Sequence, residues 1–104
     1  MEKKSKVRTF IGFAIRSGKF RIGANSIATL KKVCLMIVCK TASENTKKEA
    51  QKKSRKFGCK LLITESETLS ELTHRENAKV MAITDEKLSQ AIIDNVEEQF
   101  ILVE

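Results

Sequence analysis

Few residues of this 104-residue chain have the chemistry of a catalytic site. Three cysteines, Cys34, Cys39 and Cys59, could act as nucleophiles if the single histidine, His74, served as their base. The cysteines lie in or beside apolar stretches, whereas His74 lies in a polar segment, so the sequence favours a surface histidine and buried thiols. Because buried thiols are rarely reactive, we expect three reduced thiols in the core.

Other catalytic patterns are equally weak. The sequence has no glycine-rich phosphate loop, no nucleophile elbow and no pair of histidines for zinc. Ser66-Glu67 and Thr84-Asp85-Glu86 place hydroxyl and carboxyl groups side by side, but each precedes a segment of helical periodicity, where such residues cap helices. We therefore expect a protein that is not an enzyme and that holds neither a cofactor nor a metal ion.

Anion binding is the chemistry that the segment Gly18–Ser26 suggests. Two glycines in it bracket Lys19 and Arg21, and a small polar run then opens a predicted helix, with Lys31 and Lys32 at that helix's far end. A helix start carries free backbone N–H groups and a positive dipole end, both of which favour anions. The same glycines would also suit an ordinary helix–strand–helix connection, so the sequence leaves both interpretations open.

The charge balance points to a polyanionic partner. The formal net charge is +7 and the sequence pI is about 9.5, which nucleic acid or an anionic membrane surface could each explain. The chain has no Trp or Tyr and five Phe, too few for a surface that stacks several unpaired bases. The longest apolar run, 33–39, is too short to span a bilayer, and residues 1–8 are basic rather than signal-like. We expect a cytoplasmic protein.

Hydrophobic periodicity predicts one domain, 1–104, with a basic and frayed start at 1–6. The clearest signal is the run 34–39, a strand that is apolar on both faces and should therefore be covered on both. Helices and strands alternate, so the predicted class is α/β, a small sheet with helices on both faces. The predicted strands are 20–22, 34–39, 61–64 and 80–83, and the first three predicted helices are 7–15, 24 to about 32 and 44–57. Ser66 would cap a short helix that holds Leu69 and Leu72, and Thr84 or Asp85 would cap a last helix that carries Leu88, Ala91, Ile92 and Val96.

Two segments keep more than one interpretation. The predicted helix 44–57, which Thr41 or Ser43 could cap and Gly58 ends, is strongly cationic; its charges suit a solvated face or phosphate contacts. The apolar segment 100–103 must dock somewhere, as either a strand or a helix.

Several motifs occur in a fixed order along the chain: Ile-Gly-Phe-Ala-Ile-Arg-Ser-Gly-Lys at 11–19, Gly-Ala-Asn-Ser at 23–26, the buried strand, Ala-Ser-Glu-Asn-Thr-Lys-Lys at 42–48 and Val-Met-Ala-Ile-Thr-Asp at 80–85. Together they resemble the kink-turn RNA-binding ribosomal-protein family, of the large-subunit seven-Ae and thirty-e type, and most closely its bacterial YlxQ-like branch. The likeness runs from about residue 7 to residue 93.

The resemblance implies a three-layer α/β/α sandwich around a mixed four-stranded sheet, and binding to kink-turn RNA, a sharply bent duplex with sheared G·A pairs. In that family the Gly-x-Asn start of the second helix enters the widened groove, where the Asn reads a guanine edge; this carries over to Gly23 and Asn25. The family also uses the loop before its last strand. The predicted RNA-binding residues are Lys19, Arg21, Gly23, Ala24, Asn25, Ser26, Lys31, Lys32, Arg75, Glu76, Asn77, Ala78 and Lys79.

The sequence departs from the family pattern at the same site. Ser26 stands where a Glu commonly follows the family's Asn, and Thr29 stands where a Lys is usual. Lys40-Thr41 replaces an acidic pair, Leu69-Ser70-Glu71 replaces a Leu-Gly-Arg start, and the second helix is about one turn short. These changes keep Asn25 and the basic surroundings but remove contacts on which kink-turn selectivity depends.

The leading hypothesis is a small protein, monomeric when free, that binds structured RNA without chemistry and without a membrane or small-molecule partner; ribosomal RNA is one candidate. The alternative is a protein-interaction module within a larger ribonucleoprotein assembly, which docks through 100–103. A thiol enzyme or redox sensor is a third hypothesis.

Overall fold

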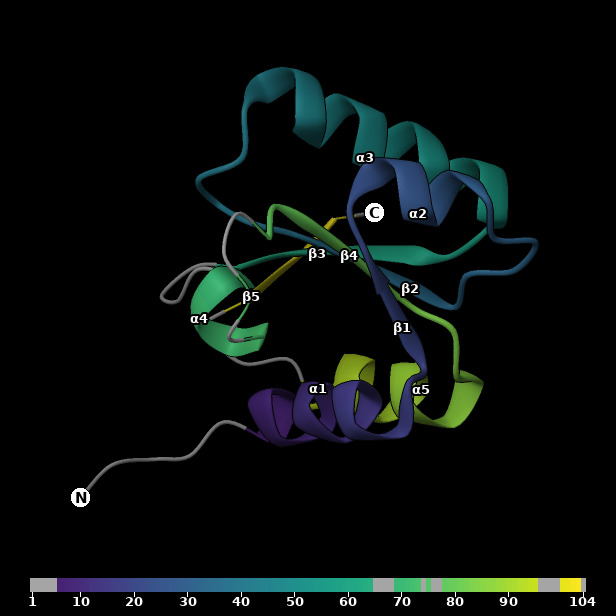
Figure 1. Cartoon of the computed structure of the whole chain (residues 1–104), viewed down its shortest axis with the longest axis vertical. Coiled ribbons are helices and arrows are strands. Elements are labelled where there is room, and N and C mark those ends of the chain that lie inside the picture. The colour runs from purple at the N-terminus through teal and green to yellow at the C-terminus, as the bar shows by residue number, and fades with distance from the viewer. Residues whose placement is uncertain (1–5, 65–68, 74, 76–77, 96–99, 104) are drawn as a thin grey trace.

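The computed structural model describes residues 6–64, 69–73, 75, 78–95 and 100–103. They fold as a three-layer α/β/α sandwich (Figure 1), which confirms the predicted α/β class. The elements are α1 (Lys6–Ser17), β1 (Phe20–Ile22), α2 (Ala24–Ala28), β2 (Leu35–Val38), α3 (Glu44–Phe57), β3 (Lys60–Thr64), α4 (Leu69–Thr73), β4 (Val80–Ile83), α5 (Glu86–Asp94) and β5 (Phe100–Val103).

The sheet is mixed, with strand order β1-β4-β2-β3-β5. Strands β2 and β3 run parallel, whereas β4 is antiparallel to both β1 and β2. These are the four expected strands. The segment 100–103, whose state the sequence left open, adds a fifth strand, β5, antiparallel to β3, with Leu102 opposite Leu62.

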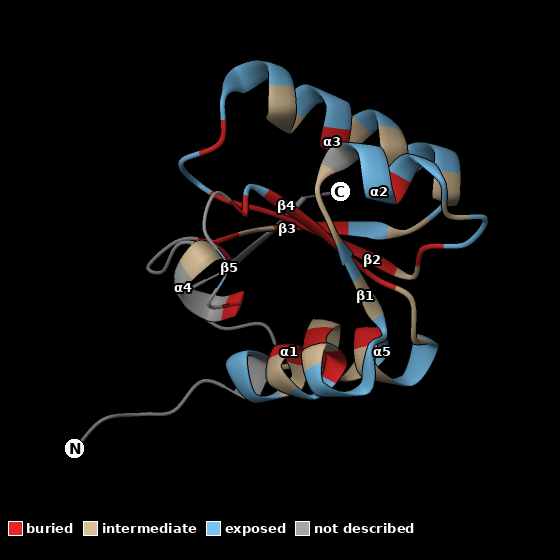
Figure 2. Ribbon diagram, viewed as in Figure 1, coloured by how far each residue is buried: buried red, intermediate tan, exposed pale blue. Residues whose placement is uncertain are grey.

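Helices cover both faces of the sheet. In Figure 1, α2 and α3 lie above it and α1 and α5 below it, with α4 beside the lower layer. All the residues of β2 and β4 are buried (Figure 2), and Leu35 and Met36 have no exposed surface. A strand flanked by helices on both faces must be apolar throughout, which is why the run 34–39 was the clearest structural signal in the sequence.

The ends of α3 follow local capping chemistry. The Ser43 side chain accepts a hydrogen bond from the Thr46 N–H at 3.1 Å, so Ser43, rather than Thr41, is the N-cap. Gly58 ends the helix with φ +67°, the left-handed conformation that glycine adopts at low cost. Asp85 caps α5 in the same way as Ser43 caps α3, since its carboxylate accepts from the Leu88 N–H.

The helix α2 ends at Ala28, so the predicted extension to about Lys32 is wrong. The Thr29 hydroxyl donates to the Ser26 carbonyl at 2.8 Å, and the Thr29 N–H bonds the same carbonyl at i−3. This tight turn replaces the next helical turn, and it lets the chain reach Val33, which is buried, before β2 begins. No helix within the described ranges is long and apolar enough to cross a membrane.

Candidate nucleic-acid interface

The pairing of β1 with β4 brings two predicted contact segments to the same place. Ile22 lies opposite Met81, and the Gly23 N–H donates to the Val80 carbonyl at 3.0 Å. The start of α2 therefore lies beside the residues that lead into β4, including Lys79. We call this place the Asn25 end of the β1–β4 pair and define it by Gly23, Asn25, Ser26 and Lys79; the opposite end is named below.

Gly23 shapes the entry to α2. Its φ of +95° lies outside the range that L side chains normally adopt, and no atom lies within 4 Å of the position that a Cβ would take. The backbone here is therefore open to close approach by a ligand. The Gly23 carbonyl accepts from the Ile27 N–H at 3.1 Å, which starts the helix and fixes Asn25 on its first turn.

Asn25 and Ser26 are exposed. Within the described part of the chain, no residue forms a hydrogen bond with the Asn25 side chain, so both its N–H donors and its oxygen are available. An amide with this freedom can donate to and accept from a base edge at the same time. The helix itself has five residues, which leaves little dipole to attract an anion.

Lys79 joins a third segment to the Asn25 end. Its Nζ donates to the Thr41 hydroxyl at 2.9 Å, and its carbonyl accepts from the Cys39 N–H at 2.7 Å. Because Thr41 is neutral, this contact orients the ammonium group without cancelling its charge. The segment between β2 and α3 thus lies next to the residues before β4.

A cleft of about 150 Å³ separates α2 from α3. Ile27, Met36 and Val80 form its apolar floor, while Asn45 and Lys53 lie among the polar residues that line it from α3. The two helices therefore make neighbouring walls on the same face of the sheet. Val80, whose carbonyl accepts from the Gly23 N–H, lies in the floor of the cleft.

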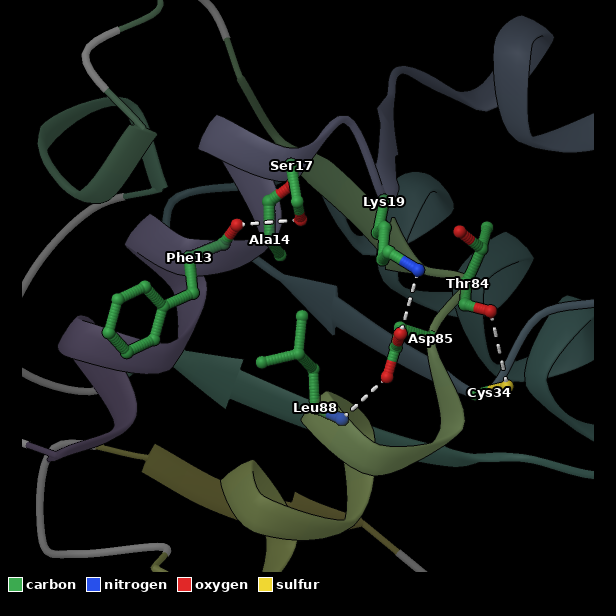
Figure 3. Close-up of polar contacts among 8 residues, drawn as sticks. All are labelled: Phe13, Ala14, Ser17, Lys19, Cys34, Thr84, Asp85 and Leu88. Atoms are coloured by element: carbon green, nitrogen blue, oxygen red, sulfur yellow. Dashed lines mark hydrogen bonds and ion pairs between the residues drawn. The ribbon is translucent and has the colours of Figure 1, made fainter.

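At the opposite end of the pair, which we call the Lys19 end, the protein itself compensates the charge of Lys19. The Lys19 Nζ lies 3.1 Å from Asp85 Oδ2, and the other carboxylate oxygen accepts from the Leu88 N–H at 2.9 Å (Figure 3). These contacts, first the Leu88 N–H and then Lys19, hold the pKa of Asp85 below its usual range. The Lys19 carbonyl also accepts from the Thr84 N–H, so backbone and side chain are both engaged.

Lys31 and Lys32 belong to the Lys19 end as well. The chain returns there after α2, since the Cys34 N–H donates to the Ile83 carbonyl at 2.9 Å. Both lysines are exposed, and Lys32 lines a cavity of about 290 Å³ that also contains Cys34 and Cys59. The structure therefore separates Lys19, Lys31 and Lys32 from Asn25, although the sequence suggested one site.

Two arginines lie along the outer strand β1, between the two ends. Arg21 is exposed, and its Nη1 donates to the Phe20 carbonyl at 2.7 Å. The Arg75 guanidinium lies 5.3 Å from the centre of the Phe20 ring. Both keep charged groups on the open edge of the sheet, where Arg75 is oriented by the aromatic face.

The remaining predicted residues divide into two groups. Ala78 as a whole residue is 1% exposed, so it packs in the core and offers a ligand almost no surface. Ala24 is the first residue of α2. Glu76 and Asn77 lie outside the described residues, as does His74.

The thiols are free. Burial raises the pKa of Cys59 to about 11, and the Cys34 Sγ donates to the Thr84 carbonyl at 3.6 Å (Figure 3). The raised pKa of Cys59 disfavours its nucleophilic thiolate. In the described ranges no three potential metal-ligating side chains gather. The expectation that the protein is not an enzyme stays a prediction.

The fold defines a small α/β/α sandwich with a mixed sheet. The same fold occurs in a solved structure from Bacillus halodurans, described as a protein with unknown function; the two chains are 18% identical over 88% of this chain and 96% of the other, with a TM-score of 0.74. At that identity the likeness shows the fold alone. No model of a known protein family matches the chain, and no curated protein sequence does.

Proposed function

We propose that this protein binds structured RNA with a sharp kink, without catalysis, through the Asn25 end. The observation that carries the proposal is the bond from the Gly23 N–H to the Val80 carbonyl. It brings the start of α2 and the residues before β4 together, and these are the two segments that the resemblance to kink-turn RNA-binding proteins assigns to the RNA.

The available chemistry supports recognition of a base edge. Asn25 presents an exposed amide that no described residue engages, and Gly23 leaves the adjoining backbone uncovered. A groove that is widened by a kink admits such a helix start, whereas the narrow major groove of straight A-form RNA does not. Asn25 would therefore read a base that only the kinked form exposes.

Charge around the Asn25 end would hold the phosphate backbone. Lys79 is oriented by a neutral hydroxyl, and Arg21 lies exposed in the middle of β1. Arg75, whose guanidinium lies over the Phe20 ring, is exposed closer to the Lys19 end. Lys19 contributes less because Asp85 compensates its charge. Ribosomal RNA is one candidate source of the kinked element.

The test compares a kink-turn RNA with a straight duplex of equal length, by binding titration at one fixed salt concentration. We expect tighter binding to the kinked RNA, and equal affinity for both would reject the proposal. Asn25→Ala should weaken binding to the kinked RNA by about 1–3 kcal/mol, or roughly 5- to 150-fold, and leave the straight duplex unaffected. Gln90→Ala, which removes an exposed amide on α5, is the matched control.

The alternative, an interaction module that docks through 100–103, has less support. The backbone of this segment pairs with β3 within the same chain, so its hydrogen-bonding groups on that side are already used.

A further inference from the structure

Helix α3 holds more than half of the protein's excess charge. It contains six cations and two acids, a net charge of +4, against +7 for the whole chain. The proposed contacts at the Asn25 end do not use the charge of α3.

The structure places most of these cations on one face. The exposed cations of α3 recur at i, i+4, i+7 and i+8, which at 3.6 residues per turn confines them to an arc of about 100°. Ala50 and Ser54 are buried on the side toward the sheet. The outer side of α3 is correspondingly exposed in Figure 2. We call this surface the α3 stripe; its members are Lys48, Lys52, Arg55 and Lys56.

The charge of the α3 stripe is little compensated. Lys52 lies 3.8 Å from Glu49, and the other ion pair on the helix, Lys47 with Glu44 at 3.9 Å, involves a lysine outside the stripe. Exposed pairs of this kind contribute little and are screened by salt. On α5, by contrast, Glu86 and Asp94 offset the exposed Lys87.

Helix α3, which carries the α3 stripe, lies across the cleft from α2, whose start belongs to the Asn25 end. Asn45 and Lys53 line one side of this cleft from α3, and Ile27 lines the other side from α2. The two helices are therefore neighbours on one face of the sandwich. From Lys48 to Lys56 the helix extends about 12 Å. A ligand that is held at the start of α2 and continues across this face would therefore meet the α3 stripe.

We propose that the α3 stripe binds the phosphate backbone of a double-stranded RNA stem that continues from the kink. The proposal rests on the proposed function and adds to it that the RNA extends beyond the kink as a duplex. A duplex fits better than an unpaired strand because the stripe carries no aromatic side chain on which bases could stack. Such contacts read no sequence and depend strongly on salt.

The test uses two RNAs with the same kink, one of which has a stem extended by a further helical turn. The variant Lys48→Gln/Arg55→Gln removes one lysine and one arginine from the α3 stripe. Its matched control, Lys87→Gln/Arg16→Gln, removes the same pair of charges from α5 and α1, which lie on the other face of the sheet. All four side chains are exposed, so we expect both variants to fold.

We expect the stripe variant to bind the long-stem RNA about 10-fold more weakly and to reduce the slope of log K against log salt by about 2, with little change on the short-stem RNA. The control should leave both RNAs unaffected. An equal loss on both RNAs, or no loss on the long one, would overturn the proposal.

The same titrations separate the two proposals. If wild-type protein does not prefer the kinked RNA but the stripe variant still loses affinity for a long duplex, the proposed function fails and the α3 stripe stands as a duplex-binding surface. If Asn25→Ala weakens binding to both kinked RNAs and the stripe variant changes neither, the proposed function stands and the stripe proposal fails.

Discussion

The two ends of the β1–β4 pair have similar glycine turns, but the exposed polar side chains beside those turns have different partners. A glycine with positive φ flanks β1 at each end, Gly18 at +73° and Gly23 at +95°, and an exposed polar side chain follows each. At one end Lys19 pairs with Asp85, which also caps α5. At the other end Asn25 has no partner among the described residues.

The difference shows that a cation beside a glycine turn does not by itself indicate a ligand-binding site. The segment Gly18–Ser26 contains two cations, but Lys19 is held by a carboxylate of the same chain. Among the described residues, none forms a hydrogen bond with the side chain of the uncharged Asn25. The segment is therefore two separate places, joined by a three-residue strand that spans about 10 Å.

The largest difference between the two ends should come from their glycines. Gly23→Ala should lower the free energy of unfolding by about 2 kcal/mol, because φ +95° with ψ +141° is a conformation that costs a side chain about 1–3 kcal/mol. Gly18→Ala should cost about 1 kcal/mol, since φ +73° is closer to the left-handed helical region. Urea unfolding measures both.

Gly12→Ala is the control for these substitutions. Gly12 lies inside α1, where alanine is favoured, and its Cβ would meet the Arg16 side chain only at 4.0 Å. We expect a gain of about 0.5–1 kcal/mol. Equal losses for Gly18→Ala and Gly23→Ala would mean that the two turns are not distinguished by backbone strain.

A smaller effect should separate the two lysines. Lys79→Gln should weaken binding to kinked RNA about 3- to 5-fold and reduce the salt slope by about 1, because a phosphate contact is lost. Lys19→Gln should change the affinity less than about 2-fold, since Asp85 already compensates that charge. A larger loss for Lys19→Gln would place the RNA at the Lys19 end.

The smallest effect concerns pH at the Lys19 end. The folded-state pKa of Asp85 lies below its unfolded value of about 3.9, so the unfolded chain takes up the proton first as the pH falls. The contribution of Asp85 should be complete above about pH 4 and decline as the pH drops through the folded-state pKa. Unfolding between pH 7 and pH 2 should show this decline in wild type, with a shallower one in Asp85→Asn.

An NMR titration of the Asp85 carboxyl group checks the same point directly. Lys19→Gln should move its midpoint upward only in part, because the Leu88 N–H bond is the larger cause of the lowered pKa. A midpoint at the ordinary aspartate value in wild-type protein would contradict the cap and ion pair described here.

The features that the sequence predicted correctly depend on neighbours along the chain. The buried strand β2, the cap at Gly58 and the strand β4 each follow from a short stretch of residues. The end of α2 was missed because the Thr29 hydroxyl competes for a helical carbonyl, which periodicity does not register. The sequence could not decide between a strand and a helix for 100–103, because a run of four apolar residues fits either periodicity.

The candidate site shows the same limit. Glycine turns and an exposed Asn25 could be read from the sequence, but which cations share a place with Asn25 could not. Lys19 and Asp85 are 66 positions apart, and Lys79 and Thr41 are 38 apart. Only the sheet brings such pairs together. Asp85 compensates the charge of Lys19, whereas Thr41 orients the ammonium group of Lys79 and leaves its charge uncompensated.

The strand order has a consequence for how the protein is made. On a ribosome, β1, β2 and β3 emerge before β4, yet β1 pairs with β4 and one side of β3 waits for β5. At about 5–20 residues per second, the roughly 40 residues from β3 to β5 take about 2–8 s to synthesise. During that interval the apolar strand β3 presents an open edge to other nascent chains.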